Sequence, residues 1–125
     1  DGDAVHRLFV AMQPASYIQP HRHLDPFKAE SLVVVRGMLG FLEFDDLGAI
    51  VSCARIGEHG DGMGIDIPPG CWHGIVALEP DTLFFETKAG PYRALARDER
   101  ATWAPGEDDP AAQATLQRLK GFFSA

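Results

Sequence analysis

The sequence is poor in three features that would each point to a particular class of protein. It has only two cysteines, Cys53 and Cys71, and no signal-like hydrophobic segment, so no disulfide framework is expected. Eleven Lys and Arg stand against eighteen Asp and Glu, which gives a formal net charge of −7. No apolar run approaches the roughly 20 residues that span a bilayer. We therefore expect reduced thiols in a cytoplasmic protein, with neither nucleic acid nor a membrane surface as a partner.

The length and composition indicate a single globular domain. A chain of 125 residues buries roughly two-thirds of its unfolded surface on folding. Its 46% hydrophobic and 23% charged residues exclude an intrinsically disordered chain. Because the first residue is Asp1 rather than Met, we expect that an N-terminal segment precedes it or has been removed.

Glycine and proline divide the chain into short apolar segments. The 13 Gly and 9 Pro recur at about the 8–12-residue spacing that is typical of all-β sandwiches and barrels. Eight strands are predicted, which is the number in a double-sheet jelly roll. They cover residues 6–13, 17–19, 30–36, 38–44, 49–56, 63–67, 74–78 and 82–87.

The last part of the chain differs from this pattern. Residues 89–108 show little periodicity and are predicted to wrap the barrel as an extended tail. Asp109 then suits a helix N-cap, with Pro110 at the first helical position. Four apolar residues follow at helical spacing and predict one stripe that docks on the barrel or on a partner: Ala112, Leu116, Leu119 and Phe123. Residues 1–108 are thus assigned to the barrel and its tail, and 109–125 to a helix of the same domain.

Three histidines and one glutamate form a candidate metal site. His21 and His23 project to the same side if their segment is extended, because side chains alternate along a strand. Glu30 opens the next predicted strand, and His73 follows the turn Pro68-Pro69-Gly70. Three neutral imidazoles and one carboxylate suit Fe, Mn, Ni, Cu or Zn better than Ca or Mg, which prefer oxygen ligands.

The spacing of these residues resembles the two motifs of the cupin family. The matching patterns are His21-x-His23-x6-Glu30-x6-Gly37 and Gly62-x5-Pro68-x-Gly70-x2-His73. The chain departs from the family in the longer gap between His23 and Glu30, and in having Ala77 and Ala15 where Asn and Gly are common. A loop over residues 24–28 that bulges outward would accommodate the longer gap.

A narrower resemblance is to the small bacterial WbuC-family cupin metalloproteins. It rests on Arg7-Leu8-Phe9, residues 17–23, residues 44–48, Pro69-Gly70-Cys71-Trp72-His73 and Ala89-Gly90-Pro91-Tyr92. The resemblance implies a double-stranded β-helix, an all-β jelly roll, with a bound divalent transition metal (Fe, Mn, Ni or Zn) on His21, His23, Glu30 and His73. Members of the WbuC family resemble proteins that are associated with the biosynthesis of surface polysaccharides. This association points to a sugar or sugar nucleotide as the ligand.

Simpler interpretations stand beside these predictions. The four residues can instead form a metal-free polar cluster in which a histidine acts as a base. His6 and His59 are interpreted as solvated surface residues, Arg22 as a brace for its loop, and Cys71 as a packing residue. Tyr92 is a further candidate at the rim of the barrel.

Two functions remain open at this point. The first is a metal-dependent enzyme, an oxygenase or isomerase, acting on a small polar molecule such as a sugar derivative or oxyacid. No general base is evident outside the ligand set. The second is a non-catalytic module in which the barrel captures a small ligand or the metal only stabilises the fold. The resemblance implies a homodimer, since small cupins commonly pair through sheet edges, and the apolar helix stripe also needs a cover.

Overall fold

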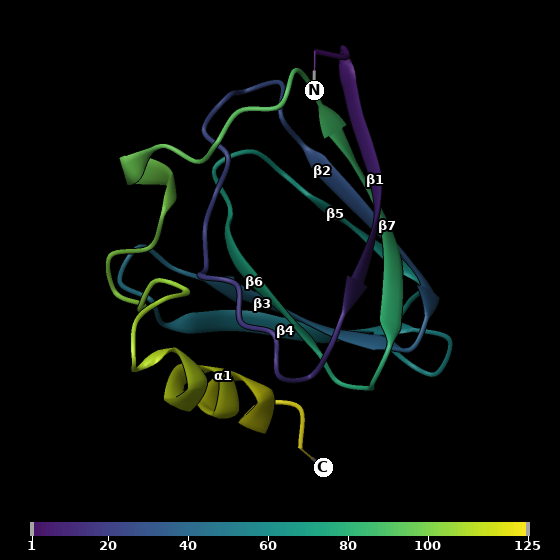
Figure 1. The fold of residues 1–125 in the computed structure, drawn as a ribbon, viewed down its shortest axis with the longest axis vertical. Helices are drawn as coiled ribbons and strands as arrows, with labels where there is room; N and C mark the ends of the chain where they lie inside the picture. The colour runs from purple at the N-terminus through teal and green to yellow at the C-terminus, as the bar shows by residue number, and fades with distance from the viewer. Residues whose placement is uncertain (1, 125) are drawn as a thin grey trace.

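Two antiparallel sheets and one short helix make up the molecule. The computed structural model describes residues 2–124. The strands are β1 (Val5–Met12), β2 (Glu30–Arg36), β3 (Met38–Phe44), β4 (Ile50–Gly57), β5 (Gly64–Ile67), β6 (Trp72–Ala77) and β7 (Thr82–Ala89), followed by a 3-10 turn, η1 (Arg97–Glu99), and a helix, α1 (Ala112–Gly121). One sheet has the order β1-β7-β2-β5 and the other β4-β3-β6 (Figure 1).

The all-β prediction is confirmed, but one predicted strand does not form. Residues 17–19 run extended without joining either sheet, so the part of the chain that the structure describes has seven strands rather than eight. Pro20 lacks an N–H group, and the Gln19 N–H is bonded to the Glu107 carboxylate instead of to a neighbouring strand. This segment therefore contacts the C-terminal tail on one side and leads directly into the histidine pair.

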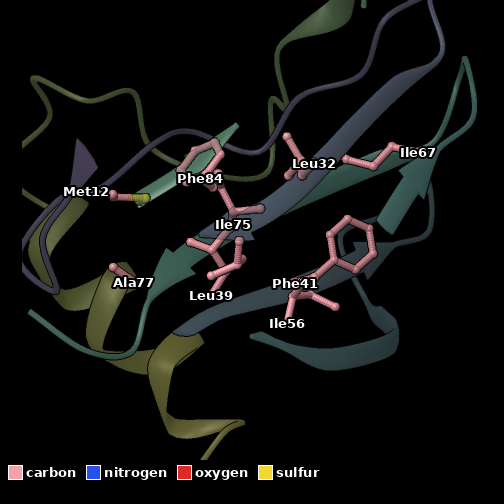
Figure 2. Close-up of a cluster of buried hydrophobic side chains, with 10 residues drawn as sticks. Met12, Leu32, Leu39, Phe41, Ile56, Ile67, Ile75, Ala77 and Phe84 are labelled. Atoms are coloured by element: carbon pink, nitrogen blue, oxygen red, sulfur yellow. The ribbon is translucent and has the colours of Figure 1, made fainter. Parts of the chain in front are cut away.

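The main core fills the space between the two sheets. Along β1, β7 and β2 as far as Val34 the even-numbered residues point inward, as the alternation of a half-buried sheet requires. They meet Leu39, Phe41 and Ile75 from the other sheet (Figure 2). Burial of each such side chain contributes about 1.5–3 kcal/mol, so this cluster is a principal source of stability.

A second core lies between the three-stranded sheet and α1, which Figure 1 shows packed below β3 and β4. Strand β3 is buried on both faces, so Leu42 and Phe44 contact the helix side while Leu39 and Phe41 face the barrel interior. Three residues of the predicted apolar stripe, Leu116, Leu119 and Phe123, belong to this cluster, and the fourth, Ala112, is also buried. The stripe therefore docks on the barrel of its own chain, and it needs no partner to cover it.

The helix begins later than the sequence predicts. Asp109 does accept a hydrogen bond through its side chain, from the Ala111 N–H at 2.8 Å. Its own carbonyl accepts from the Ala112 N–H at 2.9 Å, which closes a turn before the helix starts. Pro110 consequently lies in that turn, and Ala111 is the N-cap.

The tail that follows β7 is hydrogen-bonded to the histidine segment. Glu99 accepts hydrogen bonds from two backbone N–H groups, of Arg22 to its carbonyl and of Leu24 to its side chain. The Ala101 N–H donates to the Pro20 carbonyl at 3.0 Å.

Among the residues described, no helix is long and apolar enough to cross a membrane.

Candidate metal centre

The structure brings all four candidate ligands together. They come from three segments: His21 and His23 from the extended stretch before β2, Glu30 from the first position of β2, and His73 from β6. One donor atom from each lies within 4.8 Å of the others. His23, Glu30 and His73 are buried, and His21 is half-buried. The cluster is thus a compact three-imidazole, one-carboxylate group inside the barrel.

Backbone pairing holds two of the ligands in register. The N–H of His21 donates to the carbonyl of His73, and the reverse bond forms as well, each at 3.0 Å. Strand β6 begins at Trp72, two residues earlier than predicted, and so places His73 within a sheet. The loop between His23 and Glu30 extends outward, with Phe27 84% exposed, so the long gap does not separate the ligands.

Hydrogen bonds to carbonyl groups fix the tautomers of two rings. Nδ1 of His21 lies 3.0 Å from the carbonyl oxygen of Gln19, and Nδ1 of His73 lies 3.0 Å from that of Cys71. A carbonyl oxygen can only accept, so each Nδ1 carries the proton. The lone pair of each ring is then on Nε2, the arrangement that metal-binding histidines commonly have.

Two buried polar atoms at the centre lack a hydrogen-bond partner among the described residues. They are Nε2 of His23 and Oε2 of Glu30. The two lie 3.3 Å apart, and Nε2 of His73 lies 3.5 Å from the same carboxylate oxygen. Leaving such groups unpaired costs roughly 1–3 kcal/mol each, and a cation between them removes that cost.

The ionisation of the cluster suits metal binding. Burial, with the nearby His73 ring second, lowers the pKa of His21 to about 4, so its Nε2 lone pair is free at neutral pH. Burial opposes a charge on Glu30, but the close His23 and His73 rings outweigh it and hold the pKa of this carboxyl well below its usual range. The site therefore offers a neutral His21 ring and an ionised Glu30 carboxylate.

Two further polar residues face the cluster, and sequence reasoning missed both. Glu86 and Lys88 lie on β7, where Nζ of Lys88 is 3.2 Å from Oε2 of Glu86. Lys88 is paired in register with Glu30 of the adjacent strand. Burial and the Glu30 carboxylate raise the pKa of Glu86 to about 7. Strand alternation from the core residue Phe84 was the signal that could have placed both side chains inside.

A small cavity connects the cluster to these two residues. Its volume is about 190 Å³, or on the order of six water molecules at their share of liquid volume. Most of its walls are apolar. The lining residues are Val10, Ile18, His21, Glu30, Leu32, His73, Ile75, Phe84, Glu86 and Lys88.

The other candidates lie outside this cluster. His59 is exposed in the loop after β4, whereas His6 is half-buried, with its ring centroid 5.6 Å from that of Tyr92. Arg22 donates through Nε to the carbonyl of Asp98 and stacks on Trp72, which confirms its bracing role. Cys71 is half-buried and packs against the main core.

Comparison with known proteins supports the cupin-like fold. A variant of oxalate decarboxylase from Bacillus subtilis superposes with a TM-score of 0.59 at 18% identity, over 78% of this chain and 24% of that one. A structure concerned with the Mn(II) centres of the same enzyme gives a TM-score of 0.58, with the same identity and coverages. Procruciferin, an 11S globulin of Brassica napus, gives 0.56 at 16% identity, over 70% of this chain and 21% of that one.

The chain therefore has the fold of cupin domains and spans about a quarter of the length of the structures it matches. A family model described as a domain of unknown function (DUF6016) matches residues 1–56, which include His21, His23 and Glu30 but not His73. No curated protein matches the chain in sequence.

Proposed function

We propose that this chain is a mononuclear metal enzyme that acts on a small carboxylic acid. The observation that carries the proposal is the contact between a buried His3Glu cluster and a small interior cavity that also holds a lysine. The cavity supplies a place for a ligand beside the candidate ion. The narrower resemblance to the WbuC family, which implies a bound divalent metal, is consistent with this proposal.

The residues present fit a divalent transition metal. His21, His23, Glu30 and His73 would hold it, because their donor atoms converge and two of those atoms otherwise lack partners. Imidazole and carboxylate together suit Fe, Mn, Ni or Zn. When bound, such an ion would act as a Lewis acid or a redox centre toward an adjacent carboxylate or carbonyl group.

The size of the cavity selects among the ligands that the sequence left open. Sites for drug-sized molecules usually measure about 300–1,000 Å³. At about 190 Å³ this cavity encloses a molecule of a few heavy atoms, and it cannot enclose a sugar nucleotide. A small oxyacid is therefore favoured over a sugar derivative.

The charges around the cavity favour an anion. A divalent ion held by one carboxylate and three neutral rings leaves a net positive charge at the site. Lys88 places an ammonium group on the cavity wall, paired there with Glu86, so the net positive charge comes from the ion and Lys88 supplies a donor. Lys88 would bind the carboxylate of the ligand, and the apolar walls would exclude water from around it. Oxalate decarboxylase, whose name states that it acts on a small dicarboxylic acid, offers a precedent on the same fold.

A direct test is to measure binding and consumption of small acids by the metal-loaded chain. Calorimetry with formate, acetate, glycolate and oxalate, and with a uridine diphosphate sugar as the large comparison ligand, tests the size argument. Turnover is followed by carbon NMR of the same acids. We expect at least one acid to bind and be consumed, and the nucleotide sugar not to enter.

A matched pair of variants tests the role of Lys88. Lys88→Met removes a charge-assisted hydrogen bond worth about 1.5–3 kcal/mol, so acid affinity should fall by more than about tenfold. Lys120→Met removes the same charge from α1 and should leave acid affinity unchanged. Equal binding by both variants would contradict the assignment of Lys88, and absence of binding by every acid would contradict the substrate class.

A structural role for the metal is the second candidate function. It is favoured by the origin of the four ligands in three separate segments, which an ion would tie together. Metal-dependent stability without consumption of any acid would identify this role.

A further inference from the structure

A second cavity contacts the candidate metal centre through His23. Its volume is about 230 Å³. It lies where the tail after β7 runs beside the loop that leads into β2 (Figure 1). The loop contributes His23, Asp25 and Lys28 to its walls, and the tail contributes Arg93 and Glu99. We call this space the loop cavity, and it shares no lining residue with the interior cavity.

Lys28 is the unusual member of this lining. The residue is only 8% exposed, although a lysine is almost never buried without a paired charge. It forms no ion pair with an acidic side chain that the structure describes. Its one side-chain hydrogen bond among these residues, to the Pro91 carbonyl, is 3.5 Å long, beyond the usual range of about 2.7–3.2 Å. An ammonium group has three donors, so this buried charge still lacks acceptors.

The two carboxylates of the loop cavity are already bonded to the backbone. Both oxygens of Glu99 accept from N–H groups, one from Ala96 and one from Leu24, each at 2.9 Å. Oδ1 of Asp25 accepts from the N–H group two residues further along the chain, also at 2.9 Å. These bonds hold the carboxylates to their own turns, and neither group forms an ion pair with Lys28.

Arg93 supplies a second cation to the same cavity. The residue is exposed, and its guanidinium forms no hydrogen bond or ion pair with the part of the chain that the structure describes. A guanidinium group matches the geometry of a carboxylate or a phosphate, and an ammonium group binds either one as a point charge. A buried ammonium and an exposed guanidinium around a space of this size suit a small oxyanion.

We propose that the loop cavity binds a small oxyanion, a carboxylate or a phosphate, between Lys28 and Arg93. The anion completes the hydrogen bonding of the buried ammonium group and offsets its charge. It lies beside His23, whereas the interior cavity contacts the other three candidate ligands. This site is separate from the acid site at Lys88 and does not depend on it.

Thermal unfolding separates this role from a structural one. A buried charge with one long hydrogen bond opposes folding, and an apolar side chain of similar length removes that cost. Lys28→Met should therefore keep or raise the Tm in a buffer free of small oxyanions. If Lys28 served to tie the loop to the tail, the Tm of this variant would fall.

NMR titration resolves the two cavities because each has its own backbone amide groups. Formate, acetate, oxalate and inorganic phosphate are added in turn to the zinc-loaded chain and to the metal-free chain. At least one anion should shift the amide resonances of Ala94 and Ala96, with a Kd on the order of 1 mM for so small a ligand. The shift should occur with and without zinc, and the series distinguishes a carboxylate ligand from phosphate.

Three variants test the residues that carry the proposal. Lys28→Met should weaken anion binding at least about tenfold, because it removes a buried charge-assisted donor. Arg93→Gln should weaken it about threefold, since its side chain is exposed and screened by solvent. Arg97→Gln, on η1 and outside the lining of the cavity, is the matched control and should bind as the wild type does.

Three results would each overturn the inference: no shift at Ala94 and Ala96 with any anion, equal binding by Lys28→Met and Arg97→Gln, or a lowered Tm in Lys28→Met. Shifts confined to Glu86 and Lys88 would also overturn it, but they would support the acid site of the interior cavity. Shifts at Ala94 and Ala96 in a chain that consumes no acid would support it and count against the proposed enzyme.

Discussion

Glu30 is the residue on which the candidate centre depends most, because its carboxylate contacts two of the three rings. Nε2 of His23 and of His73 lie 3.3 and 3.5 Å from the same oxygen. Any ion held by the rings would also contact this oxygen. The residue also lies in register with Lys88, so it joins the metal cluster to the cavity wall.

Replacing this carboxylate tests its role as a ligand. Glu30→Gln keeps the size of the side chain and removes its charge, so metal affinity should fall by at least about tenfold. Competition with a chromophoric chelator measures the change. Glu58→Gln, in an exposed loop, removes an equal charge and should bind metal as wild type does. Equal affinity in both variants would exclude Glu30 from the ligand set.

Tyr17 joins the extended segment to the tail. Its hydroxyl donates to the carbonyl of Pro105 at 2.7 Å. Burial, followed by the Glu107 carboxylate, raises the pKa of Tyr17 to about 12. A folded-state pKa above the usual tyrosine value of 10.0 means that Tyr17 stabilises the fold fully below pH 10 and loses this contribution as the pH rises toward 12.

Tyr17→Phe should therefore lower the free energy of unfolding by about 1 kcal/mol at neutral pH. The difference between variant and wild type should shrink as the pH rises from about 10 to 12. Denaturant titrations at several pH values measure both effects. Tyr92→Phe, at a half-exposed ring, is the control. A difference that grows with pH would contradict the assignment.

At the scale of secondary-structure elements, the local sequence pattern was sufficient to predict a strand where clear turns lie at both of its ends. The bounds of β2 and β3 were predicted to the residue, because Gly37 separates two runs of apolar and β-branched residues. A strand was wrongly predicted over residues 17–19. The Gln19 N–H bonds to the Glu107 carboxylate of the distant tail, and the local sequence gives no sign of this contact. The inward position of Glu86 follows from the alternation of side chains along β7, but a glutamate at the polar end of a strand is usually solvated.

The segment that follows α1 packs closely against a single glycine of β3. A Cβ at Gly40 would come within 2.5 Å of the Phe123 ring. Gly40→Ala should therefore destabilise the fold by about 1–3 kcal/mol through overpacking. Denaturant unfolding measures the effect, with Gly121→Ala as the control because nothing lies within 4 Å of its added methyl group.

A second measurement separates this steric cause from a general effect on the strand. In a Phe123→Ala background the space beside Gly40 is open, so Gly40→Ala should cost less than it does in the wild type. Equal costs in both backgrounds would show that the ring is not the cause.

At the scale of the whole molecule, the convergence of the four candidate ligands was predictable because their spacing matches two motifs. The structure brings His21, His23, Glu30 and His73 together even though 52 positions separate the first from the last. The cavity and its lysine were not predictable in the same way. Their existence depends on how side chains from several strands fill the barrel, which pairwise spacing does not encode.

Metal should also stabilise the whole fold. An ion bound at a thousandfold excess over its dissociation constant adds about 4 kcal/mol to the free energy of unfolding. For a domain of this size that corresponds to a rise in Tm of more than about 8 °C. Thermal unfolding with and without a chelator measures it. An unchanged Tm in a chain shown to bind metal would mean that the unfolded chain binds the ion equally well.

The most direct test of the account is the metal content of the purified chain, measured by elemental mass spectrometry without chelator or affinity-tag nickel. The wild type and His59→Ala should each retain about one equivalent of Fe, Mn, Ni or Zn, because His59 lies in an exposed loop. His73→Ala should lose it. A wild-type chain that holds no transition metal, or a His73→Ala variant that retains a full equivalent, would contradict the central claim.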